Sequence, residues 1–200
     1  MDHRTPRITL TLSMNHYSLG NRTLSLDVRS KTLAYAVFEG STQLLDFSVS
    51  GSTYSGFQAR RVEKLVRKFQ PEVIVLRRLP AGSSRDTPAA RAAIKSIRSK
   101  ARALAVPVAF VEKHLIGETF RRHGKPTKYN IALLLATCFP ALAWYVPRKR
   151  KPWMPEDRRM QYFDAAAAGM AYFASVGNAE VVQQLLSEAE TRSQSLNRDT

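Results

Sequence analysis

Hydrophobic and polar residues alternate near the start of the chain in a pattern typical of β-strands. In the first such segment Leu24, Leu26 and Val28 fall on one side, and the next two are rich in β-forming residues. Short polar stretches separate the segments, as hairpins require. The pattern predicts an antiparallel meander of three strands, over residues 22–28, 32–39 and 43–49.

Over residues 55–111, patterns typical of helices alternate with patterns typical of strands. Apolar residues recur at helical spacing in two segments, and Thr87 and Pro88 supply an N-cap and an N1 proline for the second. Between and after them stand short continuous apolar runs, which are typical of strands buried on both faces of a parallel sheet. The predicted order is helix, strand, helix, strand, over residues 55–69, 72–76, 87–105 and 106–111.

The remainder of the chain is predicted to be helical around one proline-punctuated basic linker. The expected elements are a short helix at 114–121, a helix at 128–139, the linker at 140–155, a long helix from Pro155 to about Ser175 and a last helix at 179–191. The whole order predicts an α/β fold of the RNase H-like type. Its mixed five-stranded sheet has three antiparallel strands, then two parallel ones, with helices on both faces. Actin-like sugar kinases share this opening, so the order alone leaves the chemistry open.

The domain organisation follows from these patterns. Residues 1–21 are expected to form an arm that is disordered or adds an edge strand, residues 22–176 the RNase H-like domain, and residues 177–200 a C-terminal helix and tail. No apolar run reaches the ~18–20 residues that span a bilayer, and we expect no signal peptide. The single cysteine, Cys138, stands in an apolar stretch and is predicted to be a buried core thiol. We therefore expect a cytoplasmic protein.

Charge narrows the choice of partner. The chain has 31 Lys+Arg against 16 Asp+Glu, a formal net charge of +15. Residues 55–159 hold 24 basic and 7 acidic side chains, a net of +17, whereas residues 160–200 hold 2 and 5, a net of −3. A cationic middle indicates an anionic partner. Nucleic acid fits best, DNA ahead of RNA, because neutralised phosphates release counterions. No membrane partner is expected.

Four acidic residues are candidates for chemistry. Asp27 stands at the end of the first strand, and Asp164 opens a run of small residues in the long helix. A carboxylate in such a place is costly to bury unless it is paired or binds metal. Ordinary roles stay open: a turn-forming Asp27, and an Asp164 paired with Arg158 or Arg159. Glu156 and Asp157, expected in the first turn of that helix, are candidates for outer or substitute ligands.

Several segments together resemble the RuvC-type Holliday junction resolvases of the RNase H-like superfamily. They are Leu26-Asp27-Val28-Arg29-Ser30-Lys31 with Tyr35-Ala36-Val37-Phe38-Glu39, then Pro71-Glu72-Val73-Ile74-Val75-Leu76, Thr127-Lys128 leading into Leu133-Leu134-Leu135, and Phe163-Asp164-Ala165-Ala166. The resemblance implies acids on strand one, strand four and the last helix that hold Mg²⁺ or Mn²⁺ for phosphodiester hydrolysis. It would make Asp27 and Asp164 catalytic metal ligands, and it leaves a homodimer open.

Two positions depart from that family. Where the family carries Glu after strand four, this chain has Arg77 and then Arg78, and Gln161 stands three residues before Asp164. A fixed positive charge opposes a dication. Arg77 is therefore predicted to pair with Asp27 or Asp164, or to grip a phosphate. The other residues expected to contact nucleic acid are Arg78, Lys128 and the run Arg148, Lys149, Arg150 and Lys151, whose contacts should be to the backbone.

Three functions remain open from the sequence. The first is a metal-dependent endonuclease on branched or structured DNA, with Glu156 or Asp157 replacing the missing ligand. The second is a degenerate relative that binds nucleic acid without cleaving it. The third, an actin-like phosphotransferase, ranks below both because the chain lacks glycine-rich phosphate turns.

Overall fold

The computed structural model describes residues 22–54, 56–151 and 153–196. The arm predicted at 1–21 and the end of the predicted tail, residues 197–200, lie outside these described residues. In chain order the elements are β1 (Arg22–Val28), β2 (Thr32–Glu39), β3 (Gln43–Gly51), α1 (Phe57–Phe69), β4 (Val73–Arg77), α2 (Pro88–Ala103), β5 (Val108–Val111), α3 (Lys113–Arg121), α4 (Lys128–Cys138), the 3₁₀ helix η1 (Pro140–Tyr145), α5 (Met160–Ser175) and α6 (Ala179–Leu196).

The strands form one five-stranded sheet in the order β3-β2-β1-β4-β5. The β1–β2 and β2–β3 pairs are antiparallel, and the β1–β4 and β4–β5 pairs are parallel. This confirms the predicted α/β fold class, with three antiparallel strands followed by two parallel ones. The parallel order places the carboxyl ends of β1 and β4 side by side, with Leu26 opposite Leu76.

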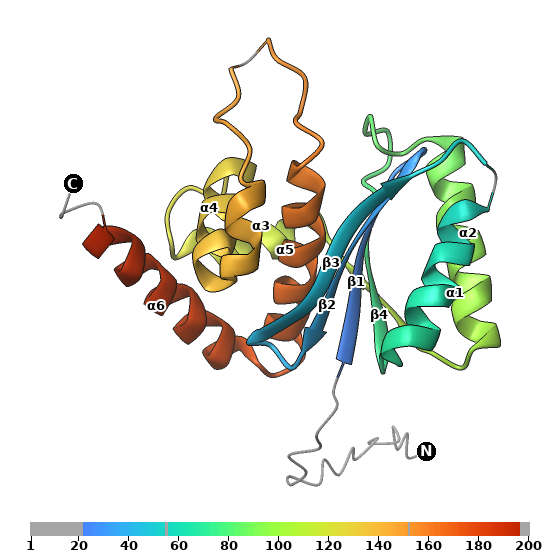
Figure 1. Cartoon of the computed structure of the whole chain (residues 1–200), viewed down its shortest axis with the longest axis horizontal. Coiled ribbons are helices and arrows are strands. Elements are labelled where there is room, and N and C mark those ends of the chain that lie inside the picture. The colour runs from blue at the N-terminus through green and yellow to red at the C-terminus, as the bar shows by residue number, and fades with distance from the viewer. Residues whose placement is uncertain (1–21, 55, 152, 197–200) are drawn as a thin grey trace, which may run out of the picture.

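Helices cover both faces of the sheet, as Figure 1 shows: α1 and α2 lie on one face, and α5 lies on the other with α3, α4 and α6 beyond it. The alternation along β1 decides which side chain meets which layer. Leu24, Leu26 and Val28 pack in the core with α1 and α2. Ser25 points the opposite way, and its hydroxyl donates a 2.7 Å hydrogen bond to the carbonyl of Ala165 on α5.

Helix α5 lies close against the sheet because its inner face is built of small residues. Residues 163–171 are all buried. At Gly169 a Cβ atom would stand 2.5 Å from Cε2 of Phe38, a fully buried ring on β2. That ring meets Phe139 and Phe173 edge-on, with centroids 5.7 and 5.6 Å away, so its position is set by its neighbours. The glycine is what allows this approach.

Two predictions about the segment before α5 are wrong. Residues 140–145, the first part of the linker predicted at 140–155, form the 3₁₀ helix η1, in which Leu142 is buried. Helix α5 begins at Met160, so Glu156 and Asp157 precede it instead of forming its first turn. Before the helix, Glu156 contacts cations from other elements, and the Asp157 carboxylate accepts a hydrogen bond from the backbone N–H of Arg159 in a local turn.

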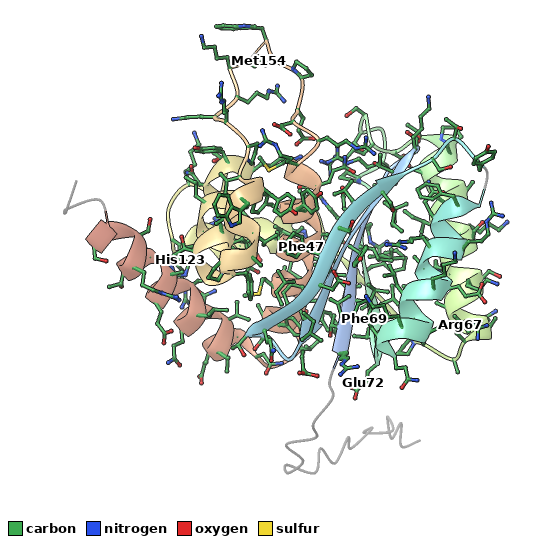
Figure 2. All side chains as sticks on the ribbon, in the orientation of Figure 1. Phe47, Arg67, Phe69, Glu72, His123 and Met154 are labelled. Carbon is green, nitrogen blue, oxygen red and sulfur yellow. The ribbon has the colours of Figure 1, made fainter. Side chains whose placement is uncertain are left out.

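Helix α6 completes the layer beyond α5. Its Val182 and Leu186 are buried in the same core as Cys138 of α4. His123, labelled in Figure 2, bonds Glu190 of α6 at 3.0 Å from its ring Nδ1. Burial raises the pKa of Cys138 to about 12, which agrees with the predicted core thiol. No helix among the described residues is long and apolar enough to cross a membrane.

The close approach of α5 gives a stability prediction. Replacing Gly with Ala inside a helix is ordinarily stabilising by up to ~1 kcal/mol. We expect Gly169→Ala to destabilise by about 1–3 kcal/mol instead, because the added methyl overpacks the Phe38 ring. Gly117→Ala in α3 is the matched control, since nothing lies within 4 Å of its Cβ position. Urea unfolding measures both, and a stabilised Gly169→Ala protein would contradict this packing.

Candidate functional site

The carboxyl ends of β1 and β4 carry the first two residues of the site. Asp27 follows Ser25 by two positions on β1, so it faces α5 rather than α1 and α2. Arg77 ends β4 and faces the same way as Val75, which packs in the α5 core. Leu26 pairs with Leu76 in parallel register, so Asp27 and Arg77 stand one residue farther on at neighbouring strand ends.

Helix α5 brings the second carboxylate to this place. Asp164 immediately precedes Ala165, whose carbonyl accepts the bond from Ser25 of β1. Asp164 is therefore held over the same edge of the sheet that carries Asp27. Both carboxylates are almost fully buried. The structure thus brings together the two acids predicted from the sequence, and neither is the turn or surface acid that remained the ordinary alternative.

Two arginines bridge these carboxylates. Arg29 donates to Asp27 Oδ2 at 3.0 Å from Nε and to Asp164 Oδ2 at 2.9 Å from Nη2. Arg85 donates to Asp27 Oδ1 at 3.2 Å from Nη1 and to Asp164 Oδ2 at 2.8 Å from Nη2. Each guanidinium therefore contacts both acids.

Three further residues complete the group. Arg77 Nη1 lies 3.2 Å from Asp164 Oδ1, which is the pairing predicted from the sequence. Glu156 reaches in from the segment before α5 to Arg29 and Arg85, at 3.3 and 3.2 Å. Lys128, at the start of α4, hydrogen-bonds Glu156 and lies 3.3 Å from Asp164. We call the whole set the ion-pair cluster: Asp27, Arg29, Arg77, Arg85, Lys128, Glu156 and Asp164.

The cluster shifts the pKa of its acids in different directions. Burial raises the pKa of Asp27, and the nearby charge of Asp164 adds to this against the opposing charges of Arg85 and Arg29. Burial also acts on Asp164, but the charges of Lys128, Arg85 and Arg77 outweigh it and hold the pKa of Asp164 below its ordinary value. The pKa of Glu156 is likewise lowered, because Lys128 outweighs the effect of burial.

Arg85 is held by the loop between β4 and α2. Gly82 takes a positive φ of 71°, and its backbone N–H donates to the Asp86 carboxylate at 3.3 Å. The N–H of Asp86 donates to the carbonyl of Ser83 at 2.9 Å. This compact turn points the Arg85 side chain at the acids. Burial lowers the pKa of Arg85, yet Asp164 and Asp27 raise it by more, so its guanidinium stays charged.

The cluster does not fit a divalent metal. Magnesium and manganese need several oxygen ligands that are free to coordinate. Here guanidinium groups donate to both carboxylates in the place that a dication would take. Within the described part of the chain, no group of three or more acidic, histidine or cysteine side chains is placed to hold a metal ion. The metal ligation predicted for Asp27 and Asp164 therefore finds no support in their partners.

The remaining predicted residues lie outside the cluster. Asp157 pairs with its neighbour Arg159 at 2.7 Å, so it is a surface acid rather than an outer ligand. Arg78 is exposed, with Glu112 3.5 Å away and the ring of Phe110 below it. The run from Arg148 to Lys151 is exposed in the segment between η1 and α5, as expected.

Sequence reasoning missed Arg29 and Arg85. Arg29 carried a signal, because it follows Asp27 by two positions and strand alternation puts both side chains on one face. Arg85 carried none, since it stands in an irregular loop 58 positions from Asp27. Gln161, three residues before Asp164, is buried and accepts a 2.7 Å hydrogen bond from the hydroxyl of Thr32.

No protein-family model and no curated protein sequence matches the chain. Solved structures of Holliday junction resolvases do match. Thermus thermophilus RuvC bound to a Holliday junction substrate gives a TM-score of 0.58 at 16% identity, over 78% of this chain and 96% of that one. The yeast mitochondrial resolvase gives 0.56 at 15%, over 92% and 87%. The fowlpox virus resolvase gives 0.52 at 15%, over 78% and 99%.

This chain has the RuvC-type resolvase fold. The comparison confirms the resemblance stated from the sequence, and at this level of identity it concerns the fold alone. What the RuvC-like fold does here therefore depends on the residues at the ends of β1 and β4. Asp27 and Arg77 stand at these ends, and together with residues from α4, α5 and the connecting segments they form the ion-pair cluster.

The lowered pKa of Asp164 gives a pH prediction. A carboxyl whose folded pKa lies below its unfolded value of about 3.9 stabilises above that pH and loses this contribution as pH falls through the folded pKa. We expect Asp164→Asn to lower the free energy of unfolding by about 3 kcal/mol at pH 7, because it leaves buried cations uncompensated. The difference from the natural protein should shrink below about pH 4. Urea unfolding at a series of pH values measures it.

Asp157→Asn is the matched control for that experiment. It removes a carboxyl whose pKa is also lowered by an arginine, but from an exposed pair with Arg159. Exposed pairs contribute little to stability, so the unfolding midpoint should hardly change. Equal losses in the two variants at pH 7 would contradict the account of Asp164 as a buried, cation-dependent acid.

Proposed function

We propose that this protein binds nucleic acid, and branched or structured DNA in particular, without metal-dependent cleavage. The observation that carries the proposal is the bridging of Asp27 and Asp164 by Arg29 and Arg85. These guanidinium groups supply the positive charge that two buried carboxylates require. The cluster leaves no place for the dication that a nuclease of this kind would need.

The nucleic-acid part of the proposal rests on charge. The chain has a formal net charge of +15, concentrated in residues 55–159. Even inside the ion-pair cluster the four cations outnumber the three acids. A surface of this kind attracts phosphates and releases their counterions. The fold agrees, since Thermus thermophilus RuvC, which shares it, was solved with a Holliday junction.

The exposed cations near the carboxyl ends of β1 and β4 are the ones we assign to phosphate contacts. Arg78 has 59% of its side chain exposed, and Lys128 has 41%. The run from Arg148 to Lys151, which precedes Glu156 in the sequence, is also exposed. Arg77 is only 10% exposed and engaged with Asp164, so in this proposal it neutralises that acid instead of gripping a phosphate.

An active endonuclease is the competing proposal. Glu156 does lie in the cluster, where a substitute for the missing strand-four acid would have to be. Its carboxylate, however, pairs with Lys128, Arg29 and Arg85, so it neutralises these cations and adds no free ligand for a metal. We therefore prefer binding without cleavage. A cytoplasmic location belongs to the proposal as well, supported by a cysteine that is free and buried rather than disulfide-bonded.

A binding experiment tests this function directly. The full chain is titrated into a labelled four-way junction at several salt concentrations, with Mg²⁺ or with EDTA. In EDTA we expect log affinity to fall with log salt at a slope of about −0.9 for each phosphate contact, and we expect binding to need no Mg²⁺. The junction should remain intact in Mg²⁺ and in Mn²⁺. Cleavage that Asp27→Asn abolishes would establish the nuclease instead, and affinity indifferent to salt would remove the electrostatic basis.

Metal binding by designed variants tests the cluster itself. Arg77→Glu restores an acid at the end of β4 but leaves Arg29 and Arg85 between Asp27 and Asp164. We expect calorimetry to detect no Mn²⁺ binding in the natural protein and little in Arg77→Glu. Combining Arg77→Glu with Arg85→Ala removes one bridging cation and adds one carboxylate, so it should bind Mn²⁺ measurably. Tight binding by the natural protein would contradict the proposed role of the arginines.

A further inference from the structure

The segment between η1 and α5 projects from the body of the molecule. We call the described residues of this segment, 146–151 and 153–159, the tip loop. In Figure 1 it extends beyond the end of the sheet at which β1 ends, and in Figure 2 Met154 marks its far end. The ion-pair cluster lies at that same end, because Asp27 and Arg77 stand at the carboxyl ends of β1 and β4. The tip loop therefore stands next to the proposed DNA-binding surface.

Both legs of the tip loop are attached to the body. Pro147 is buried at its beginning. At its end, Glu156 contacts Arg29, Arg85 and Lys128 in the ion-pair cluster. These contacts hold the loop in a defined place relative to the cluster.

The exposed part of the tip loop combines cations with a large aromatic ring. The four basic residues from Arg148 to Lys151 are exposed. Trp153 is 77% exposed, and the ammonium of Lys151 lies 5.5 Å from its ring centroid. Exposure alone does not single out Trp153, since Trp144 in η1 is 90% exposed; what distinguishes Trp153 is its position in the tip loop directly beside four exposed basic residues. This combination indicates a partner that is both anionic and flat.

We propose that Trp153 stacks on an unpaired base of single-stranded DNA while Arg148–Lys151 contact the phosphates beside that base. Every base has a π face, so such stacking tolerates any sequence, and basic residues commonly track the backbone next to it. In continuous duplex each base face is covered by its neighbours. The tip loop would therefore favour DNA with unpaired bases over duplex. This inference rests on the proposed function and adds to it the class of DNA that the loop selects.

The tryptophans of the chain make this testable by fluorescence. The chain contains 2 tryptophans, Trp144 and Trp153. Trp144→Phe leaves Trp153 as the sole source of tryptophan emission. Titrating that variant with a thymidine oligonucleotide should quench the emission, whereas an equal concentration of duplex should change it little. Unchanged emission at saturating oligonucleotide would overturn the proposal, because a stacked indole cannot keep its solvent-exposed signal.

Affinity measurements supply the second readout. Trp153→Ala should weaken binding of the thymidine oligonucleotide about 5- to 100-fold, which is the range for losing one stacked base, and should change duplex binding less than about twofold. Trp144→Ala is the matched control. It removes the same residue type, 90% exposed, from η1 rather than from the tip loop, and should leave both affinities within about twofold. Trp153→Phe keeps an aromatic face and should retain most of the affinity.

The outcomes separate this inference from the proposed function. If Trp153→Ala lost affinity equally for single strand and duplex, or lost none, the stacking proposal would be overturned. The proposed DNA binding would still hold in that case if affinity fell steeply with salt. Failure of the natural protein to bind any DNA would remove both. Tryptophan and lysine also suit an anionic lipid surface. Binding to phosphatidylserine vesicles that Trp153→Ala abolishes, without an effect of that variant on DNA, would assign the loop to membranes and overturn the proposal.

Discussion

Two carboxylates buried side by side are the constraint on which the site depends. Asp27 and Asp164 are almost inaccessible to water, and they would repel one another and be costly to desolvate without cations. Arg29 and Arg85 meet this need by contacting both acids. The close packing of α5 places Asp164 at this site, the compact turn before α2 places Arg85 there, and the non-helical segment that precedes α5 places Glu156 there. Removing any cation would leave a buried acid short of its partners.

That constraint also explains how a resolvase fold and a site without free metal ligands can coexist. The fold brings strand ends and a helix face together, and what they do follows from the side chains placed there. With carboxylates alone, the place would suit a dication. With Arg77 on β4 and arginines from two turns, the same carboxylates hold guanidinium groups. The proposed contacts with DNA phosphates rest on the surrounding cations, and the tip loop, anchored through Glu156, adds an exposed aromatic ring beside them.

Much of the fold could be predicted from local pattern. The alternation of Leu24, Leu26 and Val28 predicted β1 with its observed bounds, and the Thr87-Pro88 signal placed the start of α2 correctly. Both predictions are correct because hairpin strands and capped helices are specified by neighbours in sequence. The start of α5 was wrong by five residues, since Pro155 is an acceptable first helical residue. In that segment Glu156 pairs with Arg29 and Arg85, and no local pattern reports such distant partners.

The sequence by itself determined the order of elements, the cationic middle, and the presence of two acids and Arg77 at one edge of the sheet. Strand alternation and the small residues of α5 were enough to place these three side chains, because such patterns indicate which face of an element each side chain lies on. Only the tertiary structure decided what those acids contact. Arg85 reaches them from an irregular loop, and Glu156 from a segment expected to be helical. Long side chains on non-periodic segments can reach many places, and their partner is chosen only when folding buries carboxylates that must be neutralised.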